Sequence, residues 1–293
     1  MKKIAVFMIF GQSNATGHGV PMTENDIIKE PLKNVFGLNR EPNQSFDTEK
    51  LKFTGYTSYG MNLAENQDNT YSVPNCLAKN WQAEIDNGAK LPDLYIIQIS
   101  IGSQGVYGMW SPTRPKKLIP GKLGDCDISM YPYACHVLSL FNKYLNENEL
   151  EPDFVGMHWR GGEQEFWQSV PNLKDNDRLK NTYKTIFSGL RSALGYECPI
   201  VLHKLNFEAV LTGIEDGKHL PSMHFINEVF NDLCNEVPNV TMFDSTRAPH
   251  YNPENPYTLF RWDLIHYSPE TNNWVSRDIL EEYKIGKDGN KIL

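Results

Sequence analysis

A serine lies in the segment GQSNATG, residues 11–17, directly after the apolar run of residues 4–10. If that run is a strand of a parallel sheet, Ser13 lies at the carboxyl edge, where α/β proteins bind their ligands. The glycines at both ends of the segment permit a sharp turn and a close approach of a substrate. Ser13 is therefore a candidate nucleophile. The alternative is a structural role, in which Ser13 or Asn14 caps a short helix.

An aspartate and a histidine occur three residues apart near the other end of the chain, in the segment DLIHYSP, residues 263–269. On a turn, this spacing places both side chains on the same side, so Asp263 can accept a hydrogen bond from one ring nitrogen of His266. A carboxylate behind an imidazole fixes its tautomer and stabilises its protonated form, as a general base requires. By itself the pair also fits a structural contact or two metal ligands.

The two motifs together resemble those of the SGNH hydrolases, specifically the branch of sialate O-acetylesterases and acetylxylan esterases. The resemblance spans nearly the whole chain, and its two ends are the most specific parts. It implies a flavodoxin-like α/β/α sandwich and a carbohydrate O-acetyl ester as substrate. It also implies that Ser13 is the nucleophile, His266 the base and Asp263 the acid that orients the base.

A second block of this family is a glycine turn after the third strand, followed by a tryptophan. The matching segment here is IGSQG, residues 101–105, with Trp110 downstream. Gly102 aligns with the first glycine, while Ser103 and Gln104 depart from the pattern. The resemblance implies that the N–H groups of Gly102 and Ser13 stabilise the oxyanion, which requires only backbone donors. The alternative is an ordinary loop between a strand and a helix.

The third block of the family resembles Trp-x-Gln-Gly-Glu, in which the glutamine donates to the oxyanion. This chain has WRGGEQE at residues 159–165, so Gly161 stands where the glutamine is expected. Losing one such donor lowers turnover by roughly 10² to 10³. Three interpretations are open: Arg160 or Gln164 substitutes for the amide, the backbone donors act alone, or the protein hydrolyses esters poorly.

Other residues near these motifs have supporting roles. Gln12, Asn14 and Glu163 are expected to order the site. Glu163 matches the glutamate of the family, and we expect it to bond to the backbone or to Gln12, with an exposed salt bridge as the alternative. Aromatic rings stack on sugars, so three residues near the expected loops are candidates for substrate binding, although a core position is the alternative: Trp110, Tyr107 and Trp159. His18 and His158 lie near the motifs but lack the spacing of a metal site, so we expect no metal.

Short runs that are apolar throughout predict a parallel sheet with both faces covered. Such runs occur at residues 4–10, 94–101, 154–159, 200–205 and 240–243. Helical periodicity falls between them, at residues 72–87, 132–147, 175–194, 221–236 and 270–283. This alternation predicts a three-layer α/β fold with a sheet of about five strands, in a single domain over residues 1–293. Residues 17–70 and 103–130 lack a clear period and are expected to form long active-site loops, with one strand between residues 50 and 56.

The composition excludes some partners. The chain has 28 basic and 36 acidic side chains, a net charge of −8, which argues against nucleic acid as the main partner. No apolar run approaches the roughly 18 residues of a membrane span, so we expect no membrane partner. The opening MKKIAVFMIF lacks a small-residue cleavage site, so we expect a cytoplasmic location by default, with export or a virion as alternatives. The oligomeric state is not specified.

The sequence therefore predicts a serine carbohydrate esterase that removes O-acetyl groups by acyl transfer and needs no cofactor. One alternative belongs to another class: a catalytically weak or inactive carbohydrate-binding or structural protein on the same scaffold, which Gly161 favours. A second alternative is a metal-dependent hydrolase that uses Asp263, His266 and His158.

Overall fold

The computed structural model describes residues 1–43, 50–65, 68–114, 129–167, 176–212 and 218–287. Within these residues, seven strands form one sheet in the order β3-β2-β4-β1-β5-β6-β7. Their bounds are β1 (Lys2–Gly11), β2 (Val35–Leu38), β3 (Phe53–Gly55), β4 (Asp93–Ser100), β5 (Leu150–Arg160), β6 (Ile200–His203) and β7 (Val240–Phe243). All neighbours pair in parallel except β2 and β3, which are antiparallel.

The central strand β1 explains why the sheet is covered on both faces. Its residues 4–10 are all buried, and alternate side chains enter two different cores. Val6 and Phe10 point into one core, while Phe7 and Ile9 point into the other. A strand that is buried on both faces requires a layer of helices on each side of the sheet.

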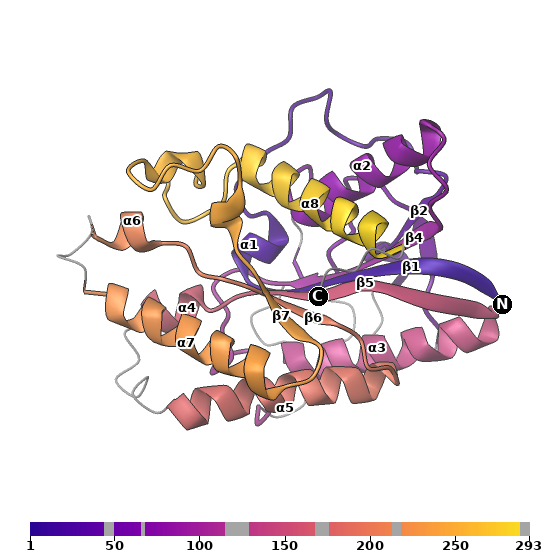
Figure 1. Ribbon diagram of the computed structural model, residues 1–293. Helices are drawn as coiled ribbons and strands as arrows, with labels where there is room; N and C mark the ends of the chain where they lie inside the picture. The colour runs from indigo at the N-terminus through magenta and orange to yellow at the C-terminus, as the bar shows by residue number, and fades with distance from the viewer. Residues whose placement is uncertain (44–49, 66–67, 115–128, 168–175, 213–217, 288–293) are drawn as a thin grey trace.

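The helices form these two layers, as Figure 1 shows: α2 and α8 cover one face, and α3, α5 and α7 cover the other. The helix bounds are α1 (Ser13–Thr16), α2 (Val73–Asp86), α3 (Met130–Glu147), α4 (Glu163–Trp167), α5 (Asn176–Leu194), α6 (Glu208–Thr212), α7 (Leu220–Glu236) and α8 (Pro269–Lys287). The last helix begins as predicted, because the Ser268 hydroxyl accepts a hydrogen bond from Thr271 N–H at 3.1 Å and Pro269 occupies the first turn.

The three-layer α/β fold is therefore confirmed, and the five predicted strands and five predicted helices are all present. The expected number of strands was too low, because β2 and β3 extend one edge of the sheet. The strand expected between residues 50 and 56 is β3. Strand β2 was missed because its sequence, VFGL, is only four residues long and lies within a segment without a clear period.

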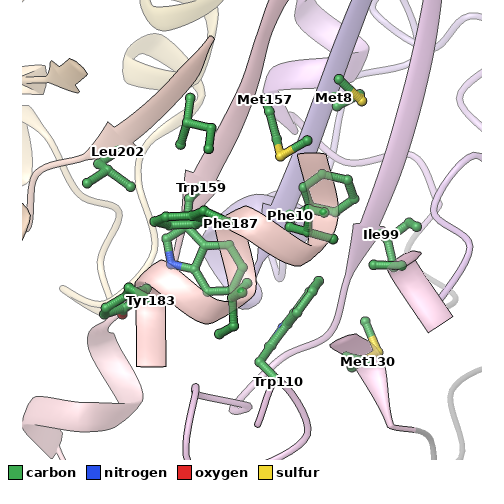
Figure 2. Close-up of a cluster of buried hydrophobic side chains, with 14 of the residues drawn as sticks. Met8, Phe10, Ile99, Trp110, Met130, Met157, Trp159, Tyr183, Phe187 and Leu202 are labelled. Atoms are coloured by element: carbon green, nitrogen blue, oxygen red, sulfur yellow. The ribbon is translucent and has the colours of Figure 1, made fainter. Parts of the chain in front are cut away.

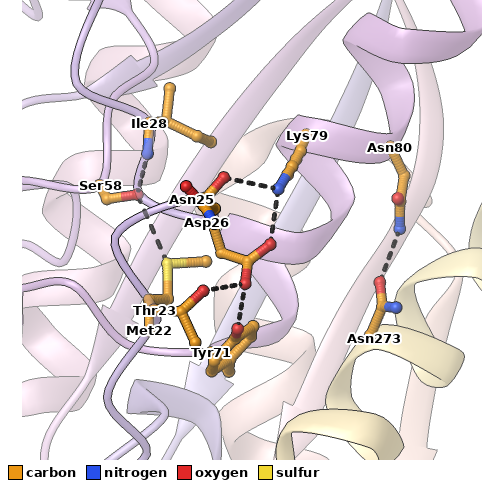
Figure 3. A network of polar contacts seen from close by, with 10 residues as sticks. All are labelled: Met22, Thr23, Asn25, Asp26, Ile28, Ser58, Tyr71, Lys79, Asn80 and Asn273. Atoms are coloured by element: carbon orange, nitrogen blue, oxygen red, sulfur yellow. Dashed lines mark hydrogen bonds and ion pairs between the residues drawn. The ribbon is translucent and has the colours of Figure 1, made fainter.

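The long segment after α1 is fixed to the helical layer by polar contacts, which Figure 3 shows around Asp26. The Asp26 carboxylate accepts hydrogen bonds from Lys79 at 2.7 Å, from Thr23 at 2.5 Å and from the Tyr71 hydroxyl. These hydrogen bonds, that of Lys79 first, hold the pKa of Asp26 well below its usual range. The described part of the segment thus packs against α2 as an ordered structure.

Among the described helices, none combines the length and the apolar character that crossing a bilayer requires.

Candidate active site

Ser13 lies where β1 turns into α1, at the carboxyl edge of the sheet. Gly11 makes this turn possible, because it has φ of +136° and a Cβ there would lie 1.9 Å from the carbonyl oxygen of Arg160. Gln12 N–H then donates to that same carbonyl at 2.9 Å, which fixes the start of the helix. Asn14 is buried, whereas Ser13 is partly exposed. The local fold therefore presents the Ser13 side chain at the surface of the sheet edge.

The predicted carboxylate and imidazole are in contact. His266 Nδ1 lies 2.9 Å from Asp263 Oδ2, and Asp263 Oδ1 accepts the backbone N–H groups of Ile265 and His266 at 3.1 and 3.0 Å. Arg261 Nε lies 2.9 Å from the same carboxylate. Burial alone would raise the pKa of Asp263, but the hydrogen bonds from the His266 ring and from the two backbone groups outweigh it and lower the pKa. An ionised Asp263 at Nδ1 leaves Nε2 of a neutral His266 as the proton acceptor.

The side chain of Asn14 connects the two motifs. Its Nδ2 donates to the carbonyl oxygen of Ile265 at 3.1 Å, and its Oδ1 accepts the N–H of Tyr267 at 3.1 Å. Ile265 and Tyr267 are the two neighbours of His266, and Asn14 is the neighbour of Ser13. The nucleophile segment and the base segment are thus held side by side, although no hydrogen bond joins the Ser13 hydroxyl to His266 among the described residues. In proteins without substrate, catalytic hydrogen bonds are often longer than in the complex.

Glu163 supports this junction. Its side chain is buried and accepts a second hydrogen bond from Asn14 Nδ2, at 2.8 Å. The expected partner was Gln12 or the backbone, and the alternative was an exposed salt bridge; the observed partner is Asn14. Gln12 instead accepts the N–H of Gln164 at 3.2 Å and lies 3.5 Å from Glu165.

The burial of Arg160 argues against the expectation that this side chain donates to an oxyanion. The side chain is only 1% exposed, and its NH1 group donates to the carbonyl oxygen of Asn14 at 3.0 Å and to Asn272 at 2.7 Å. Its guanidinium also lies over the ring of Tyr267, 4.4 Å from the centroid. Arg160 therefore links α1, the segment of His266 and the start of α8. The role of Gln164 as a donor stays a prediction.

The position of Gly161 is closely surrounded. A Cβ there would lie 3.2 Å from Trp159 Nε1 and 3.4 Å from Gln12 Nε2. A side chain at this position would be in tight contact with the Trp159 indole and in ordinary van der Waals contact with Gln12.

Gly102 lies directly beyond β4, the neighbour of β1, as an oxyanion donor would require. Its N–H donates to Oε2 of Glu65 at 2.8 Å. Glu65 Oε1 lies 3.7 Å from His18 Nδ1, and the His18 ring centroid lies 5.4 Å from that of His266. The sequence reasoning missed Glu65, since no motif marks it, and it considered His18 only as a metal ligand.

Two of the three aromatic residues expected to bind sugar are core residues, so those expectations were wrong. Trp110 and Trp159 are buried, with ring centroids 4.9 Å apart, and Figure 2 shows them within the cluster of buried side chains on the face of the sheet that α3, α5 and α7 cover. Trp110 Nε1 donates to the carbonyl oxygen of Gly11 at 3.1 Å, so the ring stabilises the turn that precedes Ser13.

Tyr107 is partly exposed, and its contact with sugar stays a prediction. Trp262, which the sequence reasoning did not single out, is 77% exposed and adjoins Asp263.

The described residues do not gather three His, Cys, Asp or Glu side chains in an arrangement that could hold a metal ion. His158, one of the three ligands in the metal-dependent alternative, is buried and bonds to His203, with 3.0 Å between Nδ1 and Nε2. Burial, with the positive charge of Arg160, lowers the pKa of His158 to about 3. The lowered pKa favours the neutral form of His158, which lies in a buried pair with His203.

Known proteins share this fold. A solved structure of NanS matches with a TM-score of 0.61 and 12% identity, over 97% of this chain and 98% of its own. The Arabidopsis thaliana protein AT4G34215 matches with a TM-score of 0.58 and 12% identity, over the same shares of the two chains.

These similarities concern the fold. No family model and no curated protein matches the sequence. The assignment of a reaction therefore depends on the geometry of the site.

Proposed function

We propose that this protein is a serine esterase that removes O-acetyl groups from a sugar or glycan. The observation that carries this proposal is the pair of hydrogen bonds by which the Asn14 side chain donates to Ile265 and accepts from Tyr267, the two neighbours of His266. These bonds hold the segment of Ser13 beside the Asp263–His266 pair. A hydroxyl, an imidazole and an orienting carboxylate in this order are the components of acyl transfer through a covalent intermediate.

The reaction has two steps. His266 takes the proton of Ser13 as the hydroxyl attacks the acetyl carbonyl, and the negative charge develops on the carbonyl oxygen. The N–H groups of Ser13 and Gly102 are the proposed donors to this oxygen. His266 then gives the proton to the leaving sugar oxygen, and an acetyl-enzyme remains. Water, deprotonated by His266, attacks this intermediate and releases acetate.

A carbohydrate substrate is supported by an exposed aromatic ring beside the site. Trp262 precedes Asp263 in the chain and exposes 77% of its surface, although an indole is a large apolar group. The Arg261 guanidinium covers part of the ring, at 4.8 Å from its centroid. An exposed ring held in this way presents a flat apolar face, against which sugar rings stack. The resemblance of the two motifs to the carbohydrate esterases points to the same class.

The test is acetate release from a panel of acetylated sugars, measured for the wild type and for Ser13→Ala. We expect the wild type to hydrolyse p-nitrophenyl acetate and at least one acetylated sugar, and the variant to lose both activities while keeping its melting temperature. If Ser13→Ala and the wild type had equal turnover, the assignment of Ser13 as the nucleophile would be refuted.

A carbohydrate-binding protein with little catalysis is the second candidate. It is favoured by Gly161, which offers no side-chain amide, and by the engagement of Gly102 N–H by Glu65. A fluorophosphonate probe separates the two candidates, because it labels Ser13 only if the hydroxyl is activated. Sugar binding without labelling would favour the second candidate.

A further inference from the structure

One of the two proposed oxyanion donors is already occupied by the protein itself. Gly102 N–H donates to Glu65 Oε2 at 2.8 Å, and Glu65 Oε1 lies 3.7 Å from His18 Nδ1. His18 belongs to the same site, because its N–H donates to the carbonyl oxygen of Ser13 at 3.0 Å and its ring lies next to that of His266. The Glu65 carboxylate thus lies in a small anion site formed by a backbone amide and an imidazole.

We propose that Glu65 is an intramolecular competitor for the oxyanion site, which an ester must displace from Gly102 before Ser13 attacks. This inference rests on the proposed esterase function and identifies a residue that limits it.

The chemistry of the two ligands is the reason for the competition. A carboxylate and a tetrahedral oxyanion both present a negatively charged oxygen that accepts a hydrogen bond from an N–H group. The single N–H of Gly102 cannot donate a full hydrogen bond to both oxygens at once. A carboxylate that remained in place would also repel the developing charge at short range.

The composition of the site makes this competition consequential. Because Gly161 supplies no side-chain amide and the Arg160 side chain is buried, the proposed donors are the backbone N–H groups of Ser13 and Gly102. While Glu65 accepts the N–H of Gly102, only the N–H of Ser13 can donate to the oxyanion. Loss of a single oxyanion donor lowers turnover by roughly 10² to 10³ in other serine hydrolases.

Displacement of Glu65 needs no rearrangement of the core. Its side chain is 23% exposed and that of His18 is 45% exposed, so the carboxylate can turn toward water or toward the imidazole. A charged acceptor holds an amide more strongly than the neutral carbonyl of an ester does. Turnover at low substrate concentration is then proportional to the fraction of molecules whose Gly102 N–H is free.

The experiment compares Glu65→Gln and Glu65→Ala with the wild type, and uses Asp68→Asn as a matched control. Asp68 lies in the same part of the chain and accepts the N–H of Gly60 at 2.7 Å, a similar bond away from the site. We measure kcat/KM for p-nitrophenyl acetate and the inhibition constant of phenylboronic acid, which forms an anionic tetrahedral adduct with an activated serine.

We expect kcat/KM to rise from the wild type to Glu65→Gln and again to Glu65→Ala, by roughly tenfold or more for the alanine variant. Phenylboronic acid should bind more tightly in the same order, and Asp68→Asn should behave as the wild type. A gain of activity is not the result that loss of a merely structural residue produces. Ester hydrolysis by Glu65→Ala but not by the wild type would support the role of Glu65 as a competitor even more directly.

Two results would overturn the inference, and they differ. If the wild type hydrolyses the ester through Ser13 but Glu65→Ala is equal or slower, Glu65 is not a competitor and the esterase function stands. If no variant hydrolyses the ester or reacts with a fluorophosphonate at Ser13, the esterase function fails and the competitor role fails with it.

Discussion

The Oδ1 atom of Asn14 accepts the N–H of Tyr267 at 3.1 Å, although the two residues are 253 positions apart in the chain. This bond and the bond from Nδ2 to Ile265 hold both sides of His266. Because Asn14 directly follows Ser13, one buried amide sets the position of the proposed base relative to the proposed nucleophile. The first prediction concerns this residue.

Replacement of Asn14 by alanine should lower kcat far more than it raises KM. The variant loses the bonds to Ile265, Tyr267 and Glu163 without removing a group that touches the substrate, so the effect is one of geometry. A displacement of about 1 Å in a reacting group can reduce the rate by roughly 10². Steady-state kinetics with p-nitrophenyl acetate, together with thermal melting, will measure this. Unchanged kcat in a folded variant would argue against a positioning role for Asn14.

Replacement of Glu165 by glutamine should remove a dependence of stability on pH. Glu165 is buried, and its Oε1 accepts the N–H of Val106 at 2.6 Å. Burial raises its pKa from 4.5 to about 7, although the hydrogen bond from Val106 opposes the shift. Between these two values the folded protein binds more protons than the unfolded chain, so the free energy of unfolding falls as pH rises through this window.

The glutamine variant keeps an acceptor for Val106 but does not titrate. The free energy of unfolding of the variant, minus that of the wild type, should therefore increase by about 2 kcal/mol from pH 5 to pH 8. Urea unfolding at several pH values measures this difference, with Glu208→Gln as the control, since Glu208 is exposed. Parallel stability curves for the wild type and Glu165→Gln would contradict the raised pKa.

Replacement of Trp262 by alanine should weaken the binding of sugar esters and leave small esters unaffected. The ring is exposed, so its loss does not open a cavity, and a small acetyl ester does not extend to it. Aromatic contacts contribute about 0.5 to 1.5 kcal/mol, so KM for an acetylated sugar should rise roughly two- to tenfold.

The matched control for Trp262 is Tyr257→Ala, because Tyr257 is 58% exposed in the nearby 3₁₀ helix Pro256–Thr258. Equal effects of Trp262→Ala on the sugar ester and on p-nitrophenyl acetate would mean that the indole acts on the Asp263 segment rather than on the sugar.

The fold could be predicted from the sequence because its signals are local. Residues 4–10 are apolar throughout, as a strand buried on both faces requires, and Ser268 with Pro269 marks the start of α8 by capping chemistry. The contact between Asp263 and His266 follows in the same way from a spacing of three. Strand β2 was not predicted, since it lies within residues 17–70, where no clear period of strands and helices marks it, unlike the equally short β6 and β7.

The contacts between distant residues could not be predicted. Glu65 reaches Gly102 across 37 positions, and nothing in its own neighbours indicates a partner. Trp110 and Trp159 lie close to functional motifs in the sequence, but that proximity does not tell which side of the sheet a ring occupies. Both rings lie in the core that α3, α5 and α7 cover, whereas Trp262, which no motif marked, is exposed to solvent.

The large separation in sequence between Asn14 and Tyr267 also has a consequence for folding during synthesis. A ribosome synthesises the serine turn first, and Tyr267 follows 253 positions after Asn14. The partners of the Asn14 side chain, and the imidazole between them, therefore do not exist while the intervening chain is being made. Under the proposed mechanism, we expect a nascent chain to cleave esters only after residues 263–267 have left the ribosome and docked on Asn14.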